Sequence, residues 1–92
     1  MLEVKYMDID TINRLLDEIN GDRSVPRNIR LSVQSAKDNL NDIDQDMEIR
    51  ISNAISILDA ISNDPNLPIY TRTQIWNVVS MLEVINKSEK KI

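Results

Sequence analysis

The residues on which most enzymes and many metal sites depend are missing from this sequence. It contains no cysteine and no histidine, so it can form no disulfide, no thiolate zinc site and no cysteine nucleophile, and it lacks the commonest general base. Its one glycine, Gly21, excludes a glycine-rich phosphate-binding loop. Carboxylates and hydroxyls would have to supply all the chemistry. We therefore predict a protein that is not an enzyme and uses no cofactor.

Three aspartates have the spacing of a calcium-binding loop. Asp42, Asp44 and Asp46 match the first, third and fifth positions of such a loop. Its sixth position should be glycine but is Met47, and its twelfth should be glutamate but is Asn53. The sharp turn and the bidentate ligand are therefore both lost, and we predict no metal site. We interpret residues 41–46 as a polar linker in which Asp44 or Asp46 caps the next helix.

Three arginines form a basic cluster at the predicted start of a helix. Arg23, Arg27 and Arg30 are spaced four and three residues apart. Guanidinium groups beside the free amides of a helix terminus can hold a phosphate or a carboxylate. The net charge of −4 opposes general binding to nucleic acids or to anionic membranes. Arg23 and Arg27 are candidate contacts to an anionic partner.

Apolar residues at helical spacing predict an all-α protein. The predicted helices cover residues 7–20, 26–40, 47–62 and 69–86, and glycine, proline and aspartate separate them. Ile43 extends the second apolar stripe, while Ile49 and Ile57 widen the third, so we expect the third helix to be the most buried. The predicted core is aliphatic and shared by all helices: Leu16, Ile19, Val33, Leu40, Ala54, Leu58, Ile61, Val79 and Leu82.

The two halves of the chain are related by a shift of 42 residues. Among the positions that match are four polar or proline pairs: Asp17 with Asp59, Asp22 with Asp64, Pro26 with Pro68, and Arg30 with Arg72. A period near 40 residues with two helices per unit is typical of HEAT-type repeats. Two units are too few for a solenoid, so we predict a four-helix bundle built from two tandem, repeat-related hairpins, residues 7–40 and 47–86. A homodimer would be the other way to cover the apolar surface.

The matched residues predict a structural role at the two hairpin turns. We expect Arg30 and Arg72 each to form an ion pair with an aspartate of its own hairpin. The candidate aspartates are Asp17 and Asp22 for the first hairpin, and Asp59 and Asp64 for the second.

Two aromatic residues near the second turn are candidate partner contacts. Trp76 stands where the first copy has Gln34, so it lies outside the stripe that the two halves share. We expect it in or beside the core because tryptophan is usually highly buried, although tryptophan is also common at interfaces. Tyr70, next to the second proline turn, has the same two interpretations.

Three segments carry a resemblance to a known family. They read SVPRNIR at 24–30, IRISNAI at 49–55 and DPNLPIYTRTQIW at 64–76. Over residues 9–82 the chain resembles the uncharacterised archaeal protein family 0147. The resemblance implies a compact all-helical domain of archaeal origin. It implies no activity, and no catalytic or binding residue can be carried over from it.

The sequence predicts a single domain over residues 1–92, with frayed ends at 1–6 and 87–92. No signal peptide or long apolar run is present, so a cytoplasmic protein that does not enter membranes is expected. The predicted function is a small helical module that binds a protein, either a second copy or another chain. The alternative is a nucleic-acid-associated accessory protein that uses Arg23, Arg27 and Arg30, although aromatics do not alternate with these basic residues.

Overall fold

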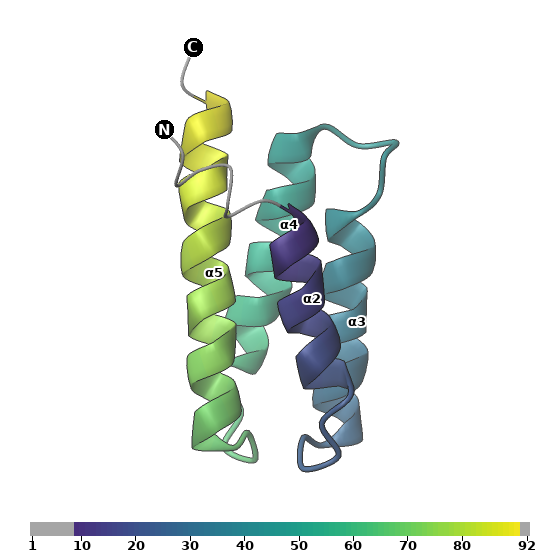
Figure 1. Cartoon of the computed structure of the whole chain (residues 1–92), viewed down its shortest axis with the longest axis vertical. Coiled ribbons are helices and arrows are strands. Elements are labelled where there is room, and N and C mark those ends of the chain that lie inside the picture. The colour runs from purple at the N-terminus through teal and green to yellow at the C-terminus, as the bar shows by residue number, and fades with distance from the viewer. Residues whose placement is uncertain (1–8, 91–92) are drawn as a thin grey trace.

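The computed structural model describes residues 9–90, which form four helices and no strand (Figure 1). The helices are α2 Ile9–Asn20, α3 Arg27–Leu40, α4 Met47–Ile61 and α5 Ile69–Lys90. The all-α prediction is confirmed. Helix α5 continues beyond the predicted end at Asn86, so residues 87–90 are helical instead of frayed. The predicted frayed segment 1–6 and residues 91–92 lie outside the described residues.

The four helices run up and down and close a ring of contacts. Helix α2 packs on α3, α3 on α4, α4 on α5, and α5 returns to pack on α2. The α2–α3 and α4–α5 turns lie at one end of the molecule, and the α3–α4 turn lies at the other (Figure 1). This arrangement confirms the predicted four-helix bundle.

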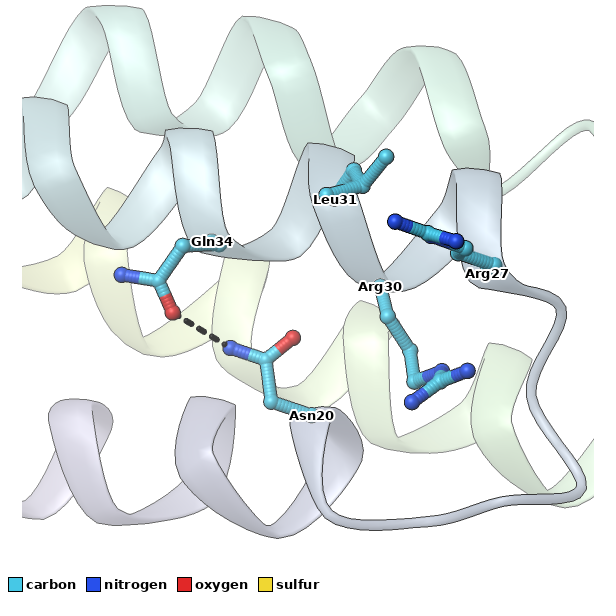
Figure 2. A pocket seen from close by; sticks show the side chains of 5 residues that line it. All are labelled: Asn20, Arg27, Arg30, Leu31 and Gln34. Atoms are coloured by element: carbon cyan, nitrogen blue, oxygen red, sulfur yellow. Dashed lines mark hydrogen bonds between the residues drawn. The ribbon is translucent and has the colours of Figure 1, made fainter.

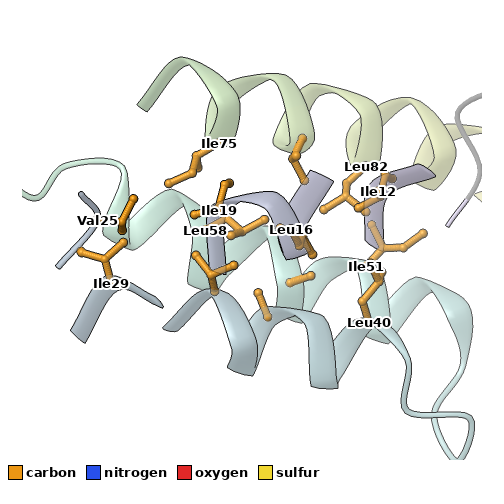
Figure 3. Packing of buried hydrophobic residues seen from close by; sticks show 14 of the residues in the cluster. Ile12, Leu16, Ile19, Val25, Ile29, Leu40, Ile51, Leu58, Ile75 and Leu82 are labelled. Carbon is orange, nitrogen blue, oxygen red and sulfur yellow. The ribbon is translucent and has the colours of Figure 1, made fainter. Parts of the chain in front are cut away.

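The core is aliphatic and draws on every helix as well as on two of the turns (Figure 3). Seven of the predicted core residues are completely buried, whereas Ile61 and Val79 are partly buried and pack against them. The buried set is Ile12, Leu16, Ile19, Val25, Ile29, Val33, Ala36, Leu40, Ile51, Ala54, Leu58, Leu67, Ile75, Val78, Leu82 and Ile85. Val25 and Leu67 come from the two turns at the same end of the bundle, so the turns also seal the core.

Three predictions about burial are wrong. Ile43 is 85% exposed because α3 ends at Leu40 and the chain has already turned away from the core. Ile49 is also exposed, because each helical residue adds about 100° and Ile49 therefore lies on the far side of α4 from buried Ile51. Helix α4 buries three residues and α3 buries four, so α4 is not the most buried helix.

All three interhelical turns have the same construction around one aspartate. In each turn the aspartate carboxylate accepts the backbone N–H two residues later, and its carbonyl accepts the N–H three residues later. For Asp22 these donors are Ser24 at 2.9 Å and Val25 at 3.1 Å. The corresponding donors are Asp44 at 3.0 Å and Gln45 at 3.1 Å for Asp42, and Asn66 at 2.8 Å and Leu67 at 3.1 Å for Asp64.

Eight positions after its aspartate, each turn is followed by an arginine that lies near the start of the next helix: Arg30, Arg50 or Arg72. The backbone N–H of each arginine donates to the carbonyl of the residue just before the helix, at 3.0, 3.0 and 2.9 Å respectively. The segment predicted to be a simple polar linker is therefore a third copy of the turn. Asp46 occupies the position that precedes α4, but its side chain makes no capping hydrogen bond.

Candidate functional site

The outer side of helix α5 carries a group of large exposed apolar residues. Ile69, Tyr70 and Trp76 are 79%, 70% and 54% exposed. Trp76 was expected in or beside the core, but its neighbour Ile75 occupies the buried position and a step of about 100° turns Trp76 outward. We call the surface formed by Ile69, Tyr70, Thr73, Trp76, Asn77 and Ser80 the α5 face.

The α5 face carries no charged side chain. From Ile69 to Leu82 the only charged residue is Arg72, and its side chain turns back to the α4–α5 turn. The outer side of α2 is different, since its exposed residues include Asp10, Arg14 and Glu18. A neutral helix face with two exposed aromatic side chains is typical of a contact surface.

A second surface feature is a pocket of about 510 Å³ between α2 and the first half of α3 (Figure 2). We call it the arginine pocket, and its lining residues are Asn20, Arg27, Arg30, Leu31 and Gln34. The side-chain amide of Asn20 donates to the Oε1 atom of Gln34 at 3.0 Å, which closes one wall. None of the lining residues is acidic.

The structure brings two of the three clustered arginines together. Arg27 and Arg30 line the arginine pocket, while Arg23 is an exposed residue of the α2–α3 turn and does not line it. Asn20, Leu31 and Gln34 complete the pocket and were not singled out from the sequence. Leu31 is 60% exposed and lies two positions after buried Ile29. An apolar residue out of register with the buried stripe is the signal that could have indicated it.

Arg30 and Arg72 contact backbone carbonyls instead of the aspartate carboxylates that the sequence predicted. Arg72 donates from Nε to the Ser62 carbonyl and from Nη2 to the Asp64 carbonyl, both at 2.9 Å. Arg30 donates from Nε to the Val25 carbonyl at 3.1 Å. The last carbonyls of a helix and those of a turn lack helical N–H partners, so a guanidinium reaching back over the turn satisfies them.

Two of the expected aspartate partners have other contacts. Asp17 pairs with Lys37, whose Nζ lies 2.6 Å from its Oδ1, and this ion pair joins α2 to α3. Asp22 accepts the Ser24 hydroxyl at 2.7 Å and the Ser24 backbone N–H at 2.9 Å. These two hydrogen bonds hold the pKa of the Asp22 carboxyl below its ordinary value, because both groups donate to the ionised form. The Ser24 hydroxyl has the larger effect and the Ser24 N–H the smaller.

The remaining acidic residues do not form a metal site within residues 9–90. No group of three or more acidic side chains there converges in a way that could hold an ion. A smaller pocket of about 370 Å³ is lined by Asp38, Asn39 and Asp42.

No helix in the described part of the chain is both long and apolar enough to cross a membrane.

Comparisons with known proteins agree with the all-helical fold. A family model described as "Uncharacterised protein family (UPF0147)" matches residues 3–85. A UPF0147 protein of Methanosarcina acetivorans is 53% identical over 76 residues, which cover 83% of this chain and 78% of that protein. One from Methanothermobacter thermautotrophicus is 48% identical over 84 residues, covering 88% and 82% respectively.

Two solved structures are also similar. A crystal structure of the unknown-function protein MMP1188 has a TM-score of 0.81 and 49% identity, and the match covers 84% of this chain and 88% of that one. A member of the uncharacterised family from Thermoplasma acidophilum has a TM-score of 0.79 and 34% identity, with 83% and 89% covered. Neither description assigns an activity, and nothing in them points to an enzyme.

Proposed function

This chain belongs to the uncharacterised protein family UPF0147, and we propose that it is a small non-enzymatic module that binds a helix of another protein on its α5 face. The observation that carries the proposal is the exposure of Tyr70 and Trp76, two of the three aromatic residues in the chain. Large aromatic side chains that water surrounds in the free protein are frequent binding anchors, because their burial releases much apolar surface.

The shape and charge of the α5 face favour a helical partner. Residues 69–80 span about 17 Å of helix at roughly 1.5 Å per residue, which is about three turns. A partner helix with an apolar stripe can lie along this length and contact Ile69, Tyr70 and Trp76 together. Because the face is neutral, the affinity should change little with salt.

The spacing of the two matching turns also supports a role in binding. Helical-hairpin repeats of the HEAT type serve mainly as binding surfaces, and the 42-residue shift has a similar period. In this bundle the inner surfaces of the hairpins are used for the core. A partner would therefore bind on an outer helix surface.

The experiment compares partner capture by two matched double variants. Tyr70→Ser with Trp76→Ser alters the α5 face, while Arg14→Ser with Glu18→Ser alters exposed residues on the outer side of α2. Tagged wild type and both variants are used to isolate proteins from an archaeal lysate at two salt concentrations. We expect a partner that the α5 variant loses and the α2 variant retains at both concentrations. The same captured proteins with both variants would refute the proposal.

Trp76 provides a direct readout because it is the only tryptophan in the chain. Its fluorescence should shift to shorter wavelength when the identified partner is added, as water leaves the indole. A shift that occurs on concentrating the protein alone would instead identify a second copy of this chain as the occupant.

The second candidate function is association with nucleic acid, which the arginine pocket favours. Arg27 and Arg30 share that pocket, and Arg23 lies in the adjoining turn. If the protein bound nucleic acid here, each phosphate contact would release condensed counterions, and removing one of these arginines would reduce the salt dependence of RNA or DNA binding. Arg72→Ala is the control, because the Arg72 side chain is directed to the α4–α5 turn. We expect no change in retention on RNA or duplex DNA for any of these variants.

A further inference from the structure

The arginine pocket holds two guanidinium groups whose charge no carboxylate of the described chain neutralises. The Arg27 side chain makes no hydrogen bond or ion pair with residues 9–90, and the Arg30 side chain uses only Nε, which donates to the Val25 carbonyl. The terminal nitrogens of Arg30 are therefore available. The two residues are three positions apart on α3, so both project from the same side of one helix (Figure 2).

The other walls of the pocket are suited to a peptide. Leu31 offers an exposed apolar contact. Asn20 and Gln34 offer amides, and these already hydrogen-bond to each other across the helices at 3.0 Å. Side-chain amides both donate and accept, which matches the donors and acceptors of a peptide backbone. Two guanidiniums, one leucine and two amides are therefore complementary to a carboxylate with an apolar neighbour.

We propose that the arginine pocket binds an acidic segment of a protein, with Arg27 and Arg30 holding one aspartate or glutamate carboxylate. The planar guanidinium group matches the geometry of a carboxylate and can donate two parallel hydrogen bonds to it. Leu31 contacts the neighbouring apolar side chain of the segment. The Asn20 and Gln34 amides bind its backbone.

The surroundings of the pocket favour a short acidic segment over a nucleic acid. Gln34 donates to the Asp38 carboxylate at 2.9 Å, so an acidic group adjoins one wall. Asp22 lies in the adjoining turn and adds a second carboxylate. A nucleic acid continuing beyond the pocket would bring further phosphates toward these carboxylates, whereas a single carboxylate need not approach them. The chain as a whole is also acidic, with a net charge of −4.

The start of α3 adds to the positive potential of the pocket. Pro26 precedes the helix and makes no side-chain capping hydrogen bond. The first amides of a helix have no partner within it and carry partial positive charge. Arg27 is the first residue of α3. An anion held by its side chain therefore lies close to this end of the helix dipole.

The test uses synthetic peptides and isotope-labelled full-length protein. One blocked peptide of about ten residues contains Glu and Leu, and its partner has every Glu replaced by Gln. A third probe is single-stranded oligouridine of similar length. Binding is followed by NMR, including the arginine Nε–H signals, and by fluorescence anisotropy. We expect the Glu peptide to shift the signals of Asn20, Arg27, Arg30, Leu31 and Gln34, and the Gln peptide to shift none of them.

Variants identify which groups bind. Arg27→Gln and Arg30→Gln should each weaken Glu-peptide binding about tenfold or more, because each removes a charge-assisted contact. Arg14→Gln, an exposed arginine on α2, is the matched control and should leave binding unchanged. Leu31→Asp places a negative charge at an exposed position of the pocket and should abolish binding without lowering the melting temperature. This variant tests the site even if Arg30→Gln loosens the turn.

Three outcomes would overturn the inference. The first is equal NMR shifts with the Glu and Gln peptides, and the second is no shift at millimolar peptide. The third is that oligouridine binds more tightly than the Glu peptide and that Arg23 contributes as much as Arg27 to this binding. The last outcome would identify the pocket as part of a nucleic-acid surface. The inference goes beyond the proposed function and can fail separately from it. The Tyr70→Ser, Trp76→Ser variant should still bind the Glu peptide, even where it loses its helical partner.

Discussion

The α2–α3 and α4–α5 turns lie at the same end of the bundle and share an aspartate, a proline and an arginine, but their arginines make different contacts. Arg72 donates to two carbonyls, those of Ser62 and Asp64. Arg30 donates to one carbonyl, that of Val25, and lines a pocket. A repeated motif can therefore fix the same backbone twice and still leave one copy of its side chain available for binding.

The two turns also differ in the residue at the end of the preceding helix. Ser62 follows the last residue of α4, and its carbonyl accepts from Arg72. The matching residue of the first turn, Asn20, is still within α2, and its side chain bonds to Gln34. Arg30 instead contacts the carbonyl of Val25, at the other side of its turn, and lines the pocket.

The largest expected effect concerns the apolar residues by which the two turns seal the core. Leu67→Ala should lower the free energy of unfolding by about 2–5 kcal/mol, because it leaves a cavity at a buried site. Val25→Ala removes a smaller side chain and should lower the free energy of unfolding by less, about 1 kcal/mol. Urea denaturation measures both. Gln45→Ala, at the matching but exposed position of the α3–α4 turn, is the control and should stay within about 0.5 kcal/mol of wild type.

The second prediction compares the two arginines directly. The sequence repeat predicts equal losses of about 1 kcal/mol for Arg30→Ala and Arg72→Ala. The structure sharpens this, because Arg72 satisfies two carbonyls and should cost about 1–3 kcal/mol, while Arg30 should cost about 1 kcal/mol or less. Arg72→Lys keeps the charge but loses the fork of donors, and it should recover only part of the loss. Equal losses for the two arginines would show that their contacts are equivalent.

The third prediction concerns the turn at the opposite end. Arg50 donates from Nε to the carbonyl of Leu40, the last residue of α3, at 2.8 Å. Because this is a single bond, Arg50→Ala should cost about 1 kcal/mol, less than Arg72→Ala. Thermal melting followed by circular dichroism provides the measurement. A neutral Arg50→Ala would mean that only the turns at one end of the bundle depend on their arginines.

The smallest expected effect concerns the Asp22 carboxyl, whose pKa is lowered in the folded protein. A carboxyl with a lower pKa in the folded than in the unfolded state stabilises the fold above its unfolded pKa. That contribution is lost as the pH falls through the folded pKa. Ser24→Ala removes the hydroxyl donor and should raise the pKa of Asp22, which carbon-detected NMR can follow. Ser35→Ala, an exposed serine of α3, should leave it unchanged.

The helices could be predicted from the sequence because their burial pattern is periodic. The stripes around Leu16, Val33, Leu58 and Leu82 each meet the bundle interior, and these residues are buried. The same reasoning extended the second stripe to Ile43, where the backbone is no longer helical. Periodicity indicates the face of a helix, but the residue at which the helix ends depends on the hydrogen bonds of the following turn, such as those of Asp42, which the apolar pattern does not reveal.

The third turn is hard to recognise in the sequence because two of its residues differ from those of the other two turns. It has Gln45 where the other turns have a buried valine or leucine, and Asp46 where they have proline. Asp42 and Arg50, which make the shared hydrogen bonds, were present but lie 20 residues from the first copy and 22 from the third. A search for the Asp-to-Arg spacing alone would have found all three.

The candidate site could be predicted only in part. The spacing of Arg27 and Arg30 on one helix placed them together, since that is a property of the helix itself. The contribution of Asn20 depends on how α2 packs on α3, which the local sequence does not determine. The exposure of Trp76 follows from the step of about 100° that separates it from buried Ile75, whereas residue type alone favoured burial.

The ring of helix contacts has a consequence for how quickly the chain folds. Of the four main helix pairs within residues 9–90, three join helices that are adjacent along the chain, and the α2–α5 pair joins distant segments. Helical proteins dominated by local contacts have low contact order and fold in about microseconds to milliseconds. Each adjacent pair can form while the rest is still disordered, so the docking of α2 on α5 is the one step that must bring distant parts of the chain together.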